Sequence, residues 1–234
     1  MEEDLRWLKL DFPNCKESGT IPSGYLSLAK AGDMKLGRPL SRNVTEAVEE
    51  IFPGKQFYYG KQEHTRLVRI VTEAYEPGQI GDGFLTQDPR IVLGVTVADC
   101  LPIFLWDPQQ NVRGLLHSGW KGTGILNEAI RLMKETFNTD PKDLYVLFGP
   151  CIGVCCYRVP EERGKFFQKQ FGKSSVQIRD GYWYLNLVGA NQYIAERYGI
   201  HTIALTGLCT SCDRRFSSFR RQGPDSYTRM LALF

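Results

Sequence analysis

The pattern of hydrophobic and polar positions alternates between short apolar runs and turn residues along most of the chain. These runs are rich in β-branched and aromatic side chains and are bounded by Gly, Pro, Asn or Asp, which is typical of strands. The most continuous runs predict strands that are buried on both faces. The predicted strands are 23–28, 57–59, 67–71, 84–86, 91–98, 101–106, 112–117, 144–148, 203–205 and 229–234.

Other segments carry apolar residues at the spacing of an amphipathic helix. Ser41 is suited to be the N-cap of the first, Pro53 and Gly54 follow its last turn, and Gly199 is suited to follow the last helix. Strands and helices alternate without a glycine-rich phosphate-binding fingerprint. We therefore expect an α/β fold, with a mixed β-sheet covered by helices, in a single domain over residues 1–234. The predicted helices are 41–52, 122–137, 161–171 and 187–198.

The overall composition argues against several classes of function. The chain has 234 residues and a formal net charge of only +3, with Lys and Arg mostly scattered, which does not indicate a general nucleic-acid binder. The longest apolar run, Ile91–Val97, is far shorter than the ~20 residues of a membrane-spanning helix. The acidic N-terminus lacks the apolar core of a signal peptide. We therefore expect a cytoplasmic protein without nucleic-acid or membrane partners.

Seven cysteines are an odd number, and in a reducing compartment free thiols or metal ligands are expected rather than a disulfide framework. Two pairs stand out, the adjacent Cys155 and Cys156 and the CxxC pair of Cys209 and Cys212. Four thiolates are enough to close a structural zinc site. Adjacent cysteines predict poor tetrahedral geometry, however, so we do not expect such a site, and the roles of the four stay open.

Two of the three histidines and one cysteine lie where apolar segments give way to polar ones: His64, Cys100 and His117. Imidazole and thiolate are ligands that zinc prefers, and three protein ligands leave a coordination position open, as in catalytic zinc sites. Each residue alone also has a structural interpretation. Asp99, beside Cys100, interrupts an apolar stretch, where a carboxylate is costly unless it is paired or functional. We therefore expect these three side chains to form one metal site, and the protein to be an enzyme.

Two further segments carry candidate ligand-binding groups. The segment 148–157 contains closely spaced glycines and a proline, which favours either a pocket wall offering backbone N–H groups or a tight connection between elements. The segment 209–223 interleaves aromatic residues with arginines, among them Arg220 and Arg221, whose guanidinium groups suit phosphate or carboxylate ligands. It is too short and isolated to favour RNA binding by base stacking.

Several motifs occur in one order along the chain: Lys61–His64, Asp82–Thr86, Val97–Ile103, His117–Gly122, Gly149–Gly153 with Cys155–Tyr157, Cys209–Thr210 with Phe216–Arg221, and Arg229–Met230. Together they resemble the YfiH or DUF152 family, first described as polyphenol oxidase or laccase. Its members are now more often described as zinc-dependent purine nucleoside phosphorylases with adenosine deaminase activity. The resemblance is specific because it needs all of these motifs at once.

The resemblance implies a fold, a ligand set and a reaction. The fold would be an α/β domain distantly similar to bacterial toxin deamidases, with one zinc ion bound by the two histidines and Cys100. The reactions would be phosphorolysis of adenosine, inosine or methylthioadenosine with inorganic phosphate, and deamination of adenosine by a zinc-activated water. Asp99 is then a candidate beside the metal or the substrate, and Arg42, Arg220 and Arg221 are candidates for holding phosphate.

Two other functions stay open. Some relatives are described as enzymes that remove a wrong amino acid from a peptidoglycan precursor, and the same site would suit amide hydrolysis. A non-enzymatic regulatory module would instead hold a structural zinc with four protein ligands, the fourth being Cys151 or Cys155. Oxidation of phenols at blue-copper and trinuclear centres needs about ten histidines. This chain has three, so copper is expected only as an adventitious ion.

Overall fold

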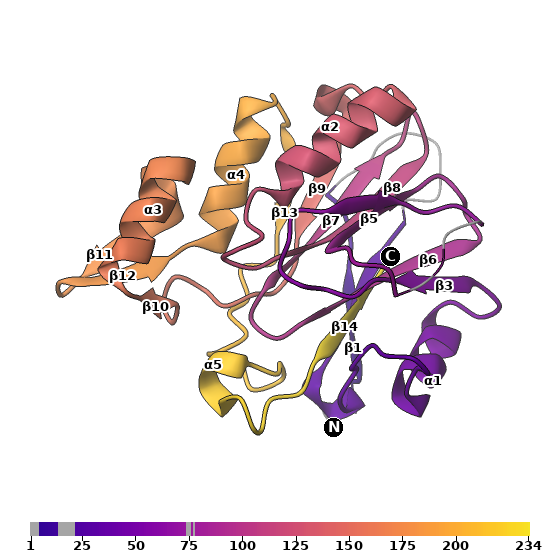
Figure 1. The fold of residues 1–234 in the computed structure, drawn as a ribbon, viewed down its shortest axis with the longest axis horizontal. Helices are drawn as coiled ribbons and strands as arrows, with labels where there is room; N and C mark the ends of the chain where they lie inside the picture. Colours follow the sequence, from indigo (N-terminus) through magenta and orange to yellow (C-terminus); the bar gives the residue numbers. More distant parts are fainter. Residues whose placement is uncertain (1–4, 14–21, 74–75, 77) are drawn as a thin grey trace.

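The computed structural model describes residues 5–13, 22–73, 76 and 78–234, and their strands form two large sheets and one small sheet (Figure 1). The five-stranded sheet has the order β1-β2-β14-β6-β3, in which β3 and β6 are parallel and the other neighbours antiparallel. Its strands are β1 (Trp7–Leu10), β2 (Gly24–Ser27), β14 (Met230–Leu233), β6 (Ile91–Val97) and β3 (Gln56–Tyr59).

The six-stranded sheet has the order β13-β9-β7-β8-β5-β4, with parallel pairs at its two edges and antiparallel pairs between them. Its strands are β13 (Thr202–Leu205), β9 (Tyr145–Phe148), β7 (Leu101–Asp107), β8 (Val112–Ser118), β5 (Gly83–Thr86) and β4 (Val68–Ile70). The small antiparallel sheet is formed by β10 (Arg158–Val159), β12 (Tyr182–Leu185) and β11 (Val176–Arg179).

The helices lie on the outer faces of the sheets or between strands (Figure 1). The α-helices are α1 (Arg42–Ile51), α2 (Ile125–Phe137), α3 (Glu161–Phe171), α4 (Leu187–Arg197) and the short α5 (Phe219–Gln222). The described residues also form 3₁₀ turns at Ala29–Ala31, Pro141–Asp143 and Lys173–Ser175.

Successive side chains of a strand point to opposite faces of its sheet, and this alternation along the central strands explains how the sheets and helices are layered. On β6, Leu93 and Val95 pack between the two large sheets, whereas Val92 packs beneath α1. On β7, Phe104 points between the sheets and Leu105 packs in the cluster that α2 and α4 cover. The two sheets are therefore stacked face to face, with α1 on one outer face and α2 and α4 on the other (Figure 1).

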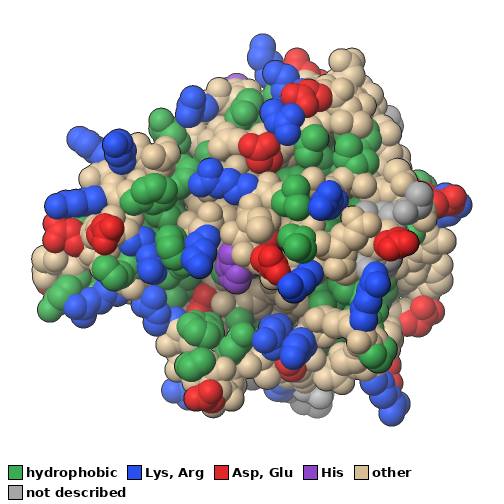
Figure 2. Space-filling view, viewed as in Figure 1, with side chains coloured by type: hydrophobic (Ala, Val, Ile, Leu, Met, Phe, Trp, Pro, Cys, Tyr) green, Lys and Arg blue, Asp and Glu red, His purple; other side chains and the backbone are tan. Residues whose placement is uncertain are grey.

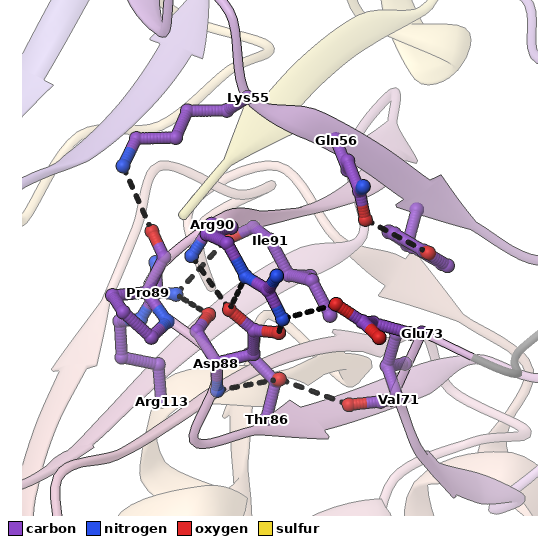
Figure 3. Close-up of polar contacts among 11 residues, drawn as sticks. Lys55, Gln56, Val71, Glu73, Thr86, Asp88, Pro89, Arg90, Ile91 and Arg113 are labelled. Atoms are coloured by element: carbon purple, nitrogen blue, oxygen red, sulfur yellow. Dashed lines mark hydrogen bonds and ion pairs between the residues drawn. The ribbon is translucent and has the colours of Figure 1, made fainter.

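A polar network fixes the turn between β5 and β6, which carries the chain from one large sheet to the other (Figure 3). The Arg90 guanidinium donates to the Asp88 carboxylate at 3.0 and 2.6 Å and also pairs with Glu73. The Arg113 guanidinium donates to the carbonyl oxygens of Asp88 and Ile91 at 2.7 and 2.9 Å. These contacts satisfy carbonyl groups at the turn, where strand partners are lost.

The α/β class and most predicted elements are confirmed. Helix α3 has the predicted bounds, and Ser41 caps α1 by accepting a hydrogen bond from Val44 N at 3.4 Å. Helix α2 begins later than predicted because Gly124 before it is left-handed, with φ 108°. The strands divide among three sheets, and the small sheet is not predicted by the sequence pattern. Within the described ranges, no helix has both the length and the apolar composition needed to cross a membrane.

Candidate functional site

The chain crosses between the two large sheets from β6 to β7, and this crossing carries Ala98, Asp99 and Cys100. Asp99 is left-handed, with φ 84°, which lets the backbone turn sharply between two buried strands. β7 then pairs with β8 so that Pro102 lies opposite His117. This register brings the Cys100 side chain to the end of β8, where His117 lies.

Asp82, just before β5, holds the loop that carries His64. Its carboxylate accepts hydrogen bonds from the backbone N–H groups of Glu63, His64 and Thr65 at 3.2, 3.0 and 2.8 Å. The Thr65 hydroxyl donates a fourth at 2.7 Å. His64 is left-handed, with φ 58°, which is uncommon for a residue with a side chain. The convergence of N–H groups on one buried carboxylate stabilises this loop conformation.

The same carboxylate orients His117. Oδ1 of Asp82 lies 2.8 Å from Nδ1 of His117, and both side chains are buried. With the Nδ1 proton donated to Asp82, Nε2 is the free ligand atom, as in carboxylate–histidine–metal sites. Burial raises the pKa of Asp82, but hydrogen bonds from His117 and Thr65 and the charge of His117 outweigh it and lower this pKa to about 2.

His64, Cys100 and His117 converge as the sequence predicts, and we call them the three-ligand cluster. Their ligand atoms lie within 4.8 Å of one another, and the two imidazole rings are 4.9 Å apart. A Cβ on Gly119 would lie 2.8 Å from Cys100 Sγ, so glycine leaves room for the cluster. Burial raises the pKa of Cys100, but the charge of His117 and hydrogen bonds from both histidines lower it to about 6. The thiolate, which is the form that binds metals, is therefore favoured.

The three-ligand cluster lies in the wall of a cavity of about 620 Å³. Figure 2 shows histidine near the middle of this face of the molecule, with Lys and Arg side chains on both sides. The cavity thus combines candidate metal ligands with aromatic and cationic side chains. The aromatic residues that line it are Trp120, Tyr157, Phe219 and Tyr227.

Of the three arginines predicted to hold phosphate, Arg220 lines the cavity. Arg42 lies on α1 with an exposed side chain that pairs with Glu46 at 2.6 Å, and it is not among the described cavity-lining residues. The Arg221 guanidinium donates to backbone carbonyls, including that of Thr210 at 2.7 Å. Its hydrogen bonds therefore hold the C-terminal segment together instead of facing the cavity.

Three other cations line the cavity, Lys121, Arg163 and Arg229, and sequence reasoning did not assign any of them to phosphate. Arg229 pairs with Asp33 at 3.3 Å, whereas the other two lie beside Trp120. The Arg163 guanidinium, from α3, lies 4.0 Å from the centre of the Trp120 ring, and Lys121 Nζ lies 5.6 Å from it. Lys121 falls inside the motif that begins at His117, which is a usable signal. Arg163 lies 46 residues beyond His117 in an ordinary amphipathic helix, so nothing local marks it.

Asp99 anchors the surrounding loops to the residue before Cys100. The Thr210 hydroxyl donates to its Oδ1 at 2.6 Å and Arg220 N donates to its Oδ2 at 2.7 Å. Ile152 N donates to its backbone carbonyl at 2.9 Å. Although Asp99 is only 8% exposed, it lines the cavity, and each carboxylate oxygen has a protein donor.

The structure also brings together the cysteines whose convergence the sequence did not predict. Adjacent Cys155 and Cys156 lie with Cys209 and Cys212 in a group whose sulfur atoms are all within 4.8 Å of one another. Adjacent cysteines therefore do not prevent the four sulfur atoms from converging, contrary to the poor geometry that was expected. Neither Cys151 nor Cys155 joins the three-ligand cluster, so a fourth protein ligand there finds no support among the described residues.

The fold and the site define an α/β protein with a cavity that carries candidate metal ligands. The family model described as "Multi-copper polyphenol oxidoreductase laccase" matches residues 33–234. The chain therefore belongs to this family, which is the YfiH or DUF152 family that its motifs resemble.

Relatives and solved structures agree with this membership. A protein of Borreliella burgdorferi named purine nucleoside phosphorylase is 30% identical over 209 residues, which cover 84% of this chain and 91% of the relative. A protein of Deinococcus radiodurans with the same name is 33% identical over 189 residues, 79% of this chain and 72% of the relative. The crystal structure of YlmD from Geobacillus stearothermophilus has a TM-score of 0.80 at 27% identity and covers 90% of each chain. The hypothetical protein YfiH of Bacillus licheniformis shares the fold, with a TM-score of 0.80 at 24% identity over 90% of this chain and 91% of that chain.

Proposed function

We propose that this protein is a zinc-dependent purine nucleoside phosphorylase that also deaminates adenosine in the same cavity. The observation that carries the proposal is the three-ligand cluster in the wall of a cavity that also holds cationic and aromatic side chains. The names of the relatives in Borreliella burgdorferi and Deinococcus radiodurans support the phosphorylase part. Adenosine, inosine and methylthioadenosine are the nucleosides to test first.

The residues present fit a zinc ion. Two imidazoles and a thiolate are a ligand set that zinc accepts, and Asp82 presents Nε2 of His117 by holding the Nδ1 proton. Only three protein ligands converge among the described residues, which suits a catalytic site with an open position. When bound, zinc would supply a Lewis acid that lowers the pKa of a coordinated water to about 7.

The cavity has the size and the side chains for a nucleoside and phosphate. Its volume of about 620 Å³ falls within the ~300–1,000 Å³ that is usual for small-molecule sites. Tyr157, Phe219 and Tyr227 offer aromatic faces for a purine, and the Phe219 and Tyr227 rings already meet edge to face at 5.1 Å. In phosphorolysis a phosphate oxygen bonds to C1′ of the ribose while the bond from C1′ to the purine nitrogen breaks.

We assign the phosphate to Arg220, Arg163 and Lys121. Arg220 has one nitrogen committed to carbonyl oxygens of Cys156 and Arg158 at 3.2 and 3.0 Å, which fixes the orientation of its guanidinium. Arg163 and Lys121 border the Trp120 ring and supply further positive charge. A preorganised set of cations would bind the dianion and orient it for attack.

The test is turnover of purified protein with adenosine or inosine, with and without phosphate. We expect free base and ribose 1-phosphate when phosphate is present, and ammonia from adenosine in either case. Cys100→Ala should lose bound zinc and both activities together. Full activity of that variant without zinc would reject the proposal, as would turnover of a muramoyl-amino-acid precursor with none of the nucleosides.

A pair of variants tests the assignment of the phosphate-binding residues. Arg163→Gln should raise the KM for phosphate by about tenfold, the value of one charge-assisted contact, and leave adenosine deamination nearly unchanged. Arg42→Gln is the matched control, because its guanidinium lies on α1 against Glu46. Equal phosphate KM values for the two variants would contradict the assignment.

A further inference from the structure

A second group of metal-ligating side chains lies outside the cavity lining, and we call it the four-cysteine cluster: Cys155, Cys156, Cys209 and Cys212. We propose that these four thiolates bind a second, structural zinc ion that ties together the two loops carrying them. The proposal does not depend on the reaction in the cavity. It concerns only how the wall of the cavity is held.

The local backbone explains how adjacent cysteines share one site. The N–H groups of Cys156 and Tyr157 both donate to the Gly153 carbonyl at 2.9 and 3.0 Å, so the chain forms a tight turn there. In this turn, the sulfurs of Cys155 and Cys156 lie 3.6 and 3.3 Å from Cys212 Sγ. In a tetrahedral site with Zn–S bonds of about 2.3 Å, sulfur atoms are about 3.8 Å apart. The separations in the cluster therefore need only small adjustments.

The contacts of Gly153 are a second observation that the sulfur atoms are arranged for a shared ligand. Its N–H points at Cys209 Sγ at 3.2 Å, a contact that stabilises a thiolate. A Cβ at Gly153 would lie 3.1 Å from Cys155 Sγ and 3.2 Å from Cys209 Cβ. The absence of a side chain at this position thus keeps the two loops close enough for their thiols to meet.

Two arginines contact the backbone of the four-cysteine cluster. Four thiolates and one Zn²⁺ carry a net charge of −2, which would be costly without nearby cations. The Arg179 guanidinium donates to the Cys155 carbonyl at 3.0 Å, and that of Arg220 donates to the Cys156 carbonyl at 3.2 Å. Both guanidinium groups are therefore hydrogen-bonded to the backbone of residues that carry proposed ligands.

Zinc is the ion that best suits this donor set. Four sulfurs around one point favour zinc or iron over harder cations. Cys155 and Cys212 are exposed, and zinc, which has no redox chemistry, is stable in such a position. The six described cysteines are free thiols in this structure, so all four members of the cluster are available.

The site would stabilise the cavity wall through contacts that already exist. The two loops meet in a parallel bridge between Cys151 and Cys209, and Thr210 N donates to the Cys151 carbonyl at 3.0 Å. Ile152 and Tyr157, in the first loop, line the cavity. A metal clamp beside this bridge would fix their positions.

The metal content of the full chain, produced with zinc and purified with a reductant, tests the proposal. We expect two zinc ions per chain in the wild type, one in Cys209→Ser/Cys212→Ser, one in Cys100→Ala and none in the combined variant. Cys151→Ala is the matched control, since it removes a neighbouring thiol outside both clusters, and it should retain two. Cobalt bound to Cys100→Ala should show intense thiolate charge-transfer and tetrahedral ligand-field bands.

Native mass spectrometry of the wild type keeps the proposal falsifiable if the double variant does not fold. A single zinc in the wild type that is lost in Cys100→Ala and kept in the double variant would overturn it, and so would a second zinc that remains in the double variant. A disulfide among these four cysteines in protein purified under reducing conditions would also overturn it. Two bound zinc ions without any nucleoside turnover would contradict only the proposed function.

Discussion

Replacing Asp82 with asparagine keeps the shape of the side chain and removes its charge, and this change should weaken both the fold and the metal site. The carboxylate accepts three backbone N–H groups, the Thr65 hydroxyl and the His117 ring. Its pKa falls from 3.8 to about 2 on folding. At about 1.4 kcal/mol for each tenfold change, the ionised form contributes about 2.5 kcal/mol to the free energy of unfolding.

The assay is urea denaturation of the metal-free protein, with a chelator present. At pH 7 we expect Asp82→Asn to unfold with a free energy lower by about 2.5 kcal/mol, because an amide cannot accept every donor and leaves some unpaired. Since folding depresses the pKa of Asp82, its contribution is complete above about pH 3.8 and is lost as the pH falls through about 2. The difference between wild type and variant should therefore narrow below pH 4.

The same variant should bind zinc about 10–100-fold more weakly, because Asp82 sets the tautomer and orientation of His117. Competition with a chromophoric chelator measures this loss. Asp88→Asn is the control: its pKa is also lowered to about 2, by hydrogen bonds from Arg90, but it lies in the turn before β6 and should leave zinc affinity unchanged. Wild-type stability of Asp82→Asn at pH 7, or a stability difference that does not vary with pH, would refute the reasoning.

Three further outcomes are expected. Gly119→Ala should lower zinc content after dialysis, because its Cβ would lie 2.8 Å from Cys100 Sγ, whereas Gly37→Ala, whose Cβ would meet Pro39 O at 3.7 Å, should not. Burial lowers the pKa of His117, but the charge of Cys100 and the hydrogen bond to Asp82 raise it to about 9. Below that pH, zinc must therefore displace a proton from the His117 ring. Zinc affinity by chelator competition should thus rise about tenfold per pH unit from pH 7 to 9 and then level off, and a flat profile would contradict this. Ser41→Ala should lower the free energy of unfolding by about 1 kcal/mol through loss of the α1 N-cap, with no change in zinc content.

How far the sequence predicts the fold depends on how strongly each segment is buried. Helix α3 is predicted because one of its faces is apolar, and the central strands β6 and β7 are predicted because they are apolar on both faces. The hairpin of β11 and β12 is missed because its apolar residues, such as Ile178 and Tyr182, are largely exposed and give no core-facing pattern. The available signal was the turn, since Asp180 and Gly181 both have positive φ, as a two-residue hairpin turn requires.

The convergence of the three-ligand cluster follows partly from the register of the β7–β8 hairpin. A turn at Pro108–Asn111 pairs Leu101 with Ser118, so Cys100 must lie beside the residue that follows, Gly119. That inference was within reach of the sequence. The approach of His64 was not, because it depends on Asp82 binding the His64 loop, a contact between residues 18 positions apart with no periodic pattern.

Two roles for Asp99 can be distinguished by experiment: positioning of the loops and proton transfer to the substrate. Both of its carboxylate oxygens already accept hydrogen bonds from protein donors. If Asp99 positions Cys100 and the loops of the cavity wall, removing the Thr210 hydroxyl that donates to it should have the same effect as replacing Asp99. Thr210→Val deletes the 2.6 Å hydrogen bond to Asp99 Oδ1, worth about 1.5–3 kcal/mol for a charged acceptor. We therefore expect Asp99→Asn and Thr210→Val to share a raised KM, a similar zinc loss and an unshifted pH profile. If Asp99 instead transfers a proton to the substrate, Asp99→Asn alone should lower kcat and remove one limb of that profile, since Thr210→Val leaves the carboxylate in place.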